Sequence, residues 1–232
     1  EKVAECVAAM IAATPIPVSV KHRIGVDELD RYEDLTNFIT VVSATGCNRF
    51  IVHARKAWLQ GLSPKDNRTI PPLRYSDVHQ LKQDFPHLYI EIIGGFKTLE
   101  QVKNQLQSVD AVMIGRAAYD TPYLFATVDQ DIFGDQSRPV RTRHQVVQDM
   151  LPYIDDWTSQ GTRLNSITRH MLHLFHAQPG SRIWKRTLTE GAGQPNAGVQ
   201  VVKDALALVR EAQDVAIDHM AAADSRYAES LL

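Results

Sequence analysis

The chain has 232 residues, of which 44% are hydrophobic and 22% are charged, and its formal charge is −2 at neutral pH. This length supports one sizeable core or two smaller ones, and the charge excludes a uniformly basic nucleic-acid binder while leaving a local basic face open. No apolar run approaches the ~20 residues of a membrane span and no signal-peptide pattern is present, so the composition predicts a soluble, cytoplasmic protein. The chain begins without methionine inside an amphipathic helical pattern, which suggests a fragment.

Helical and strand-like patterns alternate through the first half of the chain. A helix over 3–13 ends at a Pro-Ile-Pro turn, and helical periodicity returns before Gly46, over 75–85 and over 98–109. A long, basic, proline-bounded loop runs from 54 to 73. Strands are expected at 18–23, 49–53, 88–93 and 110–115. This alternation predicts a parallel sheet with right-handed crossovers.

The last two expected strands both end in glycine. Gly94 and Gly95 follow one apolar run, whereas Gly115 and Arg116 follow the other. Glycines let backbone N–H groups approach an anion, and an arginine adds a fixed positive charge. Tight turns between strand and helix would explain the glycines alone, but two successive strands that end this way, with an arginine, favour a phosphate cradle.

Four such strands fit half of a (β/α)8 barrel or part of an open doubly-wound sheet. Lys21, His53, the glycine pair and Arg116 all fall at carboxyl ends, the face where barrel enzymes hold their chemistry, so the barrel is favoured. Cys47 precedes its strand and is expected at the opposite end, where it is a poor nucleophile. With only one other cysteine, Cys6, a disulfide framework and an all-cysteine metal site are excluded.

The second half of the chain reads as helical, with helices at 140–160, 163–176, 182–190 and 199–218. We therefore divide the chain into a partial barrel, 1–135, and a helical domain, 136–232. No acidic residue lies between Asp156 and Glu190, a segment that contains five basic residues. A polyanion-facing surface and a solvated helix face explain this equally well. His173 and His176 lie three residues apart on an expected helix, but no further metal ligand is nearby, so packing or an RNA-facing role is favoured over metal binding.

Several motifs together resemble the tRNA-dihydrouridine synthase family, and most closely its A subfamily. They are VKHRIG at 20–25, HARKAWLQGLSPKDNRTIPPL at 53–73, IGG at 93–95, IGRAAY at 114–119, TRHMLHLF at 168–175 and GSRIWKR at 180–186. The resemblance implies an FMN-bound (β/α)8 barrel followed by a helical tRNA-binding domain. The implied reaction reduces the uridine C5–C6 bond in the tRNA D-loop, at position 20 or 20a, with NADPH as the reductant.

The resemblance also implies roles for particular residues. Lys21 matches a lysine that contacts the flavin, and His53 matches an FMN-contacting histidine. The phosphate-binding positions are matched by Gly94, Gly95, Gly115 and Arg116. At Ile93 the family commonly has asparagine, so one side-chain contact to the cofactor is expected to be missing.

On the RNA side, the resemblance places Arg23 and the segment from Lys65 to Arg68 near the uridine pocket and the tRNA backbone. Arg182 and Lys185 match contacts of the helical domain. The family's protonating cysteine would precede Glu1, and neither cysteine of this chain is expected to replace it. The chain alone is therefore expected to be inactive and, with uncovered sheet edges, to self-associate.

Two other function classes remain open at the level of sequence. One is an RNA- or phosphate-binding module without chemistry, against which Lys21 and His53 speak. The other is a phosphate-binding barrel enzyme of the aldolase or dihydroorotate dehydrogenase kind, against which the basic helical region speaks.

Overall fold

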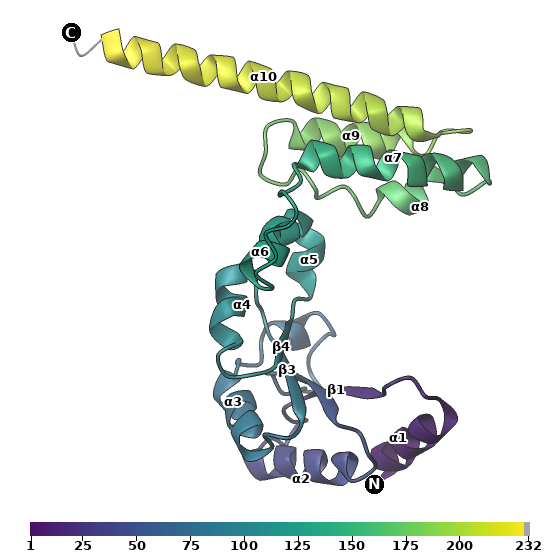
Figure 1. Ribbon diagram of the computed structural model, residues 1–232, viewed down its shortest axis with the longest axis vertical. Helices are drawn as coiled ribbons and strands as arrows, with labels where there is room; N and C mark the ends of the chain where they lie inside the picture. The colour runs from purple at the N-terminus through teal and green to yellow at the C-terminus, as the bar shows by residue number, and fades with distance from the viewer. Residues whose placement is uncertain (230–232) are drawn as a thin grey trace. The chain divides into compact units, whose positions relative to one another are not determined.

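The structure is a computed structural model that describes residues 1–229, with side chains described as far as residue 217. The chain divides into two compact units, Glu1–Ala117 and Ala118–Leu232 (Figure 1). This boundary precedes the one placed after residue 135, because short helices at 116–131 follow the last strand directly and their pattern is weak in the sequence.

The first unit alternates helices and strands. Its elements are α1 (Lys2–Ala13), β1 (Ser19–Arg23), α2 (Tyr32–Ser43), β2 (Arg49–His53), the 3₁₀ helix η1 (Asp66–Arg68), α3 (Tyr75–Asp84), β3 (Tyr89–Ile93), α4 (Leu99–Gln105), β4 (Ala111–Met113) and the start of α5 (Arg116–Asp120). The four strands form one sheet in the order β1-β2-β3-β4, and every neighbouring pair is parallel. The predicted parallel sheet is therefore confirmed.

One face of this sheet carries the hydrophobic core of the unit. Phe50 and Val52 of β2 lie in register with Ile90 and Ile92 of β3, and all four side chains are fully buried. They pack with buried residues of α1, α2 and α3, namely Val7, Leu35, Ile39, Val42, Val78 and Leu81. Figure 1 shows α2, α3 and α4 following one another around the same side of the sheet. Because side chains alternate along a strand, the other face is left to Lys21, Ile51, Glu91 and their neighbours.

The second unit is helical throughout its described residues. Its elements after α5 are the 3₁₀ helix η2 (Pro122–Thr127), α6 (Val128–Asp131), α7 (Arg143–Ser159), α8 (Leu164–Thr168), α9 (Ser181–Gly191) and α10 (Val199–Glu229). Trp184 and Leu188 of α9 pack against buried residues of α7 and α10, among them Ile154 and Val209. Despite the length of α10, none of the described helices has the combination of length and apolar composition that a membrane crossing requires.

The predicted helix over 163–176 is wrong beyond Thr168. From Arg169 to Gln178 the backbone forms successive turns, and Leu174 N–H donates to Met171 O whereas His176 N–H donates to His173 O. Two side chains from neighbouring helices donate hydrogen bonds to carbonyl oxygens of this segment. Trp184 Nε1 donates to Met171 O and Arg143 Nε donates to Leu174 O, each at 2.9 Å. These competing donors stabilise turns in place of a continuous helix, so His173 and His176 do not share a helix face.

Candidate functional site

The carboxyl ends of the strands meet at one rim of the sheet. Arg23, His53, Ile93 and Met113 are direct neighbours across the four strands. Lys21 precedes Arg23 by two residues, so it lies on the same face of β1, and its side chain is exposed. The structure thus brings the expected rim residues of different strands together.

His53 is the titratable group at the centre of this rim. Burial and neighbouring positive charges lower the pKa of His53 to about 4, so its imidazole is neutral at neutral pH. The charges that contribute, in decreasing order, belong to Arg23, Lys21, Arg55 and Arg116. Four cations that act on one imidazole mark a positive region to which an anion would be attracted.

The three glycines at the rim, Gly94, Gly95 and Gly115, occupy different structural environments. A Cβ atom on Gly94 would lie 2.7 Å from Leu73 Cδ2 and 3.1 Å from Tyr75 Cε1, so a side chain there would require these neighbours to shift. Gly95 has a φ of +74°, a conformation that side chains disfavour. A Cβ atom on Gly115 would meet only Ile93 Cδ1, at 3.7 Å, which leaves the backbone there open to a ligand.

Arg116 follows Gly115 and is exposed. Its Nη2 donates to Arg68 O at 3.3 Å, and none of the described carboxylates pairs with it. The helix that begins after the glycine pair starts only at Leu99, and its first turn is capped by Thr98, whose Oγ1 accepts from Gln101 N. The anion-binding groups at this rim are therefore the arginine, the lysine and open backbone, and they fit a phosphate group.

Tyr75 and Arg55 also belong to this site, although the sequence pattern predicts no role for either. Tyr75 Oη donates to Gly94 O, and its ring stacks on Phe96 with 5.2 Å between centroids. Arg55 Nη1 donates to Thr69 O at 3.1 Å. In both hydrogen bonds the donor and acceptor are distant in the sequence, so a local sequence pattern does not predict them. The position of Arg55, two residues after the expected rim residue His53, does indicate that it lies near the site.

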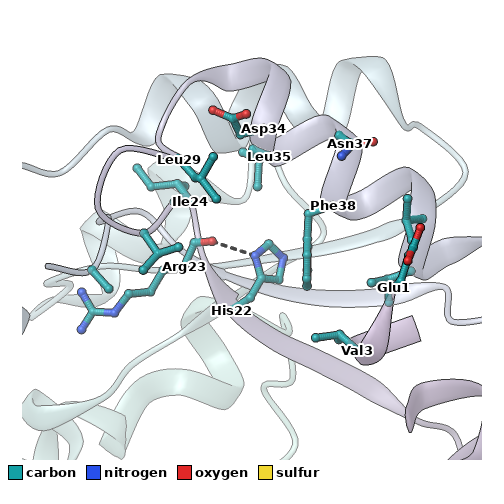
Figure 2. Close-up of a pocket in the computed structure, with 15 residues that line it drawn as sticks. Glu1, Val3, His22, Arg23, Ile24, Leu29, Asp34, Leu35, Asn37 and Phe38 are labelled. Atoms are coloured by element: carbon teal, nitrogen blue, oxygen red, sulfur yellow. Dashed lines mark hydrogen bonds between the residues drawn. The ribbon is translucent and has the colours of Figure 1, made fainter. Parts of the chain in front are cut away.

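A cavity of about 530 Å³ lies between β1, α2 and the start of α1, and Arg23 is among the residues that line it (Figure 2). His22 points into it beside Phe38, with 4.8 Å between the ring centroids, and burial lowers the pKa of His22 to about 4. His22 Nδ1 donates to Arg23 O at 2.8 Å, whereas its Nε2 has no partner among the described residues. Arg23 therefore borders both this cavity and the charged rim, and in Figure 2 its guanidinium points away from His22 and Phe38.

The cysteines lie elsewhere. Cys47 is buried beside the amino ends of the strands, where its Sγ contacts Val18 O at 3.5 Å, and Cys6 is exposed on α1. The described residues contain no cluster of three or more His, Cys, Asp or Glu side chains placed to hold a metal ion.

The remaining predicted residues are at the surface. Lys65 and Arg68 are exposed at either end of η1 in the first unit. In the second unit, Arg182 is exposed and Lys185 half-buried on α9, one helical turn apart, with Lys185 at the edge of the face that buries Trp184 and Leu188. None of these four side chains has a hydrogen bond or ion pair within the part of the chain whose side chains are described.

Comparisons with known proteins identify relatives over nearly the whole chain. A family model described as dihydrouridine synthase matches residues 1–213. Three relatives named tRNA-dihydrouridine(20/20a) synthase, from Synechocystis sp., Vibrio cholerae and Escherichia coli K12, are 56%, 57% and 53% identical over 204, 208 and 213 residues. These alignments cover 88%, 89% and 90% of this chain but only 61%, 63% and 61% of the relatives.

The chain therefore spans less than two thirds of the length of these relatives, yet the family match leaves only its last residues uncovered. The motifs at 20–25, 53–73 and 114–119, which carried the resemblance, lie inside the matched region and surround the charged rim. The resemblance is confirmed, and the chain belongs to the dihydrouridine synthase family.

Proposed function

We propose that this chain is the carboxyl part of a flavin-dependent tRNA-dihydrouridine synthase, which reduces uridine 20 or 20a of the D-loop with NADPH as the reductant. The observation that carries the proposal is the positive rim of the sheet, where Lys21 and Arg116 lack carboxylate partners among the described residues and His53 is neutral. The names of the relatives agree with this activity.

The sheet supports a partial barrel as the scaffold. Its strands follow in sequence order without a switch point, and the helices that pack on it share one face, whereas a doubly-wound sheet carries helices on both faces. We propose that residues 1–135 are the last four strands of an FMN-binding barrel with their flanking elements. Among the described strands, β1 and β4 are each paired on one side only, which is the basis for expecting self-association.

FMN suits the carboxyl-end rim of the sheet because its phosphate group suits the cradle at Gly115 and Arg116. Arg116 and the open backbone at Gly115 would hold the phosphate, with Gly94 and Gly95 lining the neighbouring turn. Lys21 and His53 would face the flavin, where the lysine supplies a cation and the neutral imidazole a hydrogen-bonding group. Bound FMN would supply the hydride that the reduction needs. At the asparagine position of the family, Ile93 offers only an apolar contact beside Gly115.

We propose tRNA as the partner of both units, and hence the cytoplasm as the location. In the first unit Lys65 and Arg68 offer unpaired charges on the loop that Arg23 contacts. In the second, residues 136–232 would form the RNA-binding helical domain through Arg182 and Lys185 on α9. Cationic side chains of this kind bind phosphates and make affinity depend on salt.

The general acid of the reduction is outside residues 1–232 in this proposal. A cysteine that protonates uracil C5 must reach the base at the rim, but Cys47 is buried at the amino end of the sheet and Cys6 belongs to α1. We therefore expect residues 1–232 to bind FMN and tRNA without forming dihydrouridine.

The experiment is to purify residues 1–232, titrate FMN by fluorescence quenching, and measure both tRNA binding and dihydrouridine formation with excess FMN and NADPH. FMN and tRNA binding without turnover is the expected result. Binding of tRNA with no binding of FMN would instead support an RNA-binding module without chemistry. Robust turnover would overturn the assignment of the general acid.

A further inference from the structure

The loop between β2 and α3, residues 54–73, contains only the three-residue helix η1 as regular structure. Loops of this length inside a compact domain are uncommon, and their conformation depends on contacts to the rest of the fold. Lys65 and Arg68, the loop's exposed cations, can act on a ligand only where those contacts place them.

Arg23 makes two such contacts. Its Nη1 donates to Lys56 O and to Asn67 O, each at 2.8 Å. The acceptors lie 33 and 44 residues further along the chain, one near the start of the loop and the other in η1. One half-buried guanidinium at the end of β1 therefore joins two distant points of the loop to the sheet.

The residue that Arg23 holds organises the loop in turn. Asn67 Oδ1 accepts from Trp58 N at 2.8 Å, and Asn67 Nδ2 donates to Trp58 O. The Asn67 side chain thus makes hydrogen bonds to both backbone polar groups of Trp58, as a neighbouring strand would. Asn67 N also donates to Ser63 O at 2.9 Å, which fixes the turn that presents Lys65. Movement of Asn67 would release both the turn and the position of Trp58.

The surroundings of Arg23 fit a structural donor better than a free cation. Burial, together with repulsion from Arg55 and Arg68, lowers its pKa. The two carbonyl oxygens already occupy Nη1, whereas Lys65 and Arg68 have no partner among the described side chains. Of these three cations, the two on the loop have their whole charged groups available to RNA phosphates.

We propose that Arg23 is a positioning residue, which holds the 54–73 loop through Lys56 O and Asn67 O and acts on RNA phosphates through Lys65 and Arg68. The part of this inference that concerns RNA rests on the proposed function. The part that concerns the loop stands on the hydrogen bonds alone.

The first experiment measures amide hydrogen exchange of residues 54–73 in the 232-residue chain without RNA. Hydrogen bonds from a charged donor are among the stronger ones, so Arg23→Gln should speed exchange in this loop about tenfold or more while the helices of the second unit stay unchanged. Arg23→Lys should not restore protection, because the lysine side chain is one bond shorter and its ammonium falls short of the position of Nη1 between the two carbonyls. Lys21→Gln, on the same face of β1 and without a described partner, is the matched control and should leave the loop as it is.

The second experiment measures the salt dependence of binding to an unmodified tRNA transcript. Arg68→Gln removes a phosphate contact and should reduce the slope of log affinity against log salt by about 0.7–0.9. Arg23→Gln should weaken binding up to about tenfold with the slope unchanged, because Lys65 and Arg68 still reach their phosphates once the loop is ordered.

Unchanged loop exchange in Arg23→Gln, or a slope reduced as in Arg68→Gln, would overturn the positioning role. If the wild-type chain binds no tRNA, the proposed function fails in its RNA part, but the exchange experiment still decides whether Arg23 holds the loop.

Discussion

Cationic side chains along the sheet differ in whether they have a carboxylate partner. At the amino end Arg49 donates from Nη2 to Glu91 Oε2 at 3.1 Å and lies over the ring of Tyr89, 4.6 Å from its centroid, so its charge is paired within the fold. After the carboxyl end of β4, Arg116 has no carboxylate partner among the described residues, and Lys21 in the middle of β1 has none either. The comparison teaches that Arg49 is neutralised within the fold, whereas Arg116 and Lys21 keep charges that a ligand could neutralise.

The largest expected effect is a loss of folding stability at low pH. It arises from the burial of His22 and not from the unpaired cations. Burial keeps the His22 imidazole neutral in the folded chain down to about pH 4, whereas the unfolded chain takes up its proton near 6.5. Stability is therefore present above pH 6.5 and is lost as the pH falls towards 4, by about 3 kcal/mol in total. Urea unfolding at pH 7 and pH 4.5 should show this loss, and His22→Leu should reduce it.

His53 also has a pKa lowered to about 4, and an NMR titration compares it with His22. Its pKa is lowered partly by positive neighbours, so salt or bound phosphate should raise it, whereas the pKa of His22 should not respond to phosphate. NMR titration of the two imidazoles in phosphate and in a chloride solution of equal ionic strength distinguishes them. Equal responses would contradict the unpaired-charge interpretation of the rim.

The second prediction removes the exposed arginine of the rim. Arg116→Ala should weaken FMN binding by about tenfold to a hundredfold, since a charged hydrogen bond to phosphate contributes about 1.5–3 kcal/mol. Fluorescence titration of FMN and of riboflavin, which lacks the phosphate, provides the control, because riboflavin binding should not change. Arg138→Ala, an exposed arginine of the second unit, should leave both affinities unaltered. Equal losses for the two flavins would show that Arg116 does not bind the phosphate.

The third prediction tests the paired end. Arg49→Met should destabilise the first unit by about 1–2 kcal/mol, because Glu91 is only 7% exposed and keeps a charge without a partner. The effect stays below that of a fully buried pair since the Arg49 side chain is half exposed. Urea unfolding measures the loss, Arg49→Met with Glu91→Leu should recover much of it, and FMN binding should be unaltered in both variants.

The smallest effect on stability is expected for the unpaired lysine. Lys21→Met should change the free energy of unfolding by less than about 0.5 kcal/mol, because its side chain is exposed and has no described partner. The same variant should bind FMN more weakly. Arg49→Met is expected to do the opposite, since it should lose stability and keep its FMN affinity. A large loss of stability in Lys21→Met would remove the distinction between the two ends.

The sheet could be predicted from the sequence because its signals are local. The run of β-branched and aromatic residues at 49–53 is the observed β2, and the last strand was placed correctly although it is shorter, Ala111–Met113. The short helices between 116 and 131 were not anticipated, because segments of four to six residues have too few positions to show a period.

What sequence could not provide are contacts between distant residues. The turns after Thr168 depend on Trp184 and Arg143, which capture carbonyls from other helices. Likewise, the contacts of Arg23 join residues 33 and 44 positions apart. A motif indicated that Arg23 matters, but only the structure shows what its guanidinium touches.

The two kinds of glycine at the rim bear on how related sequences should be interpreted. Leu73 and Tyr75 fill the space beside Gly94, so in a relative that had lost its cofactor a larger residue there would still require these side chains to shift. Gly115 has open space beside it, and its replacement would be tolerated by the fold once no phosphate approached. Across a set of homologues, alanine or serine at position 115 beside an invariant glycine at 94 would therefore identify chains that keep the scaffold after cofactor binding has been lost.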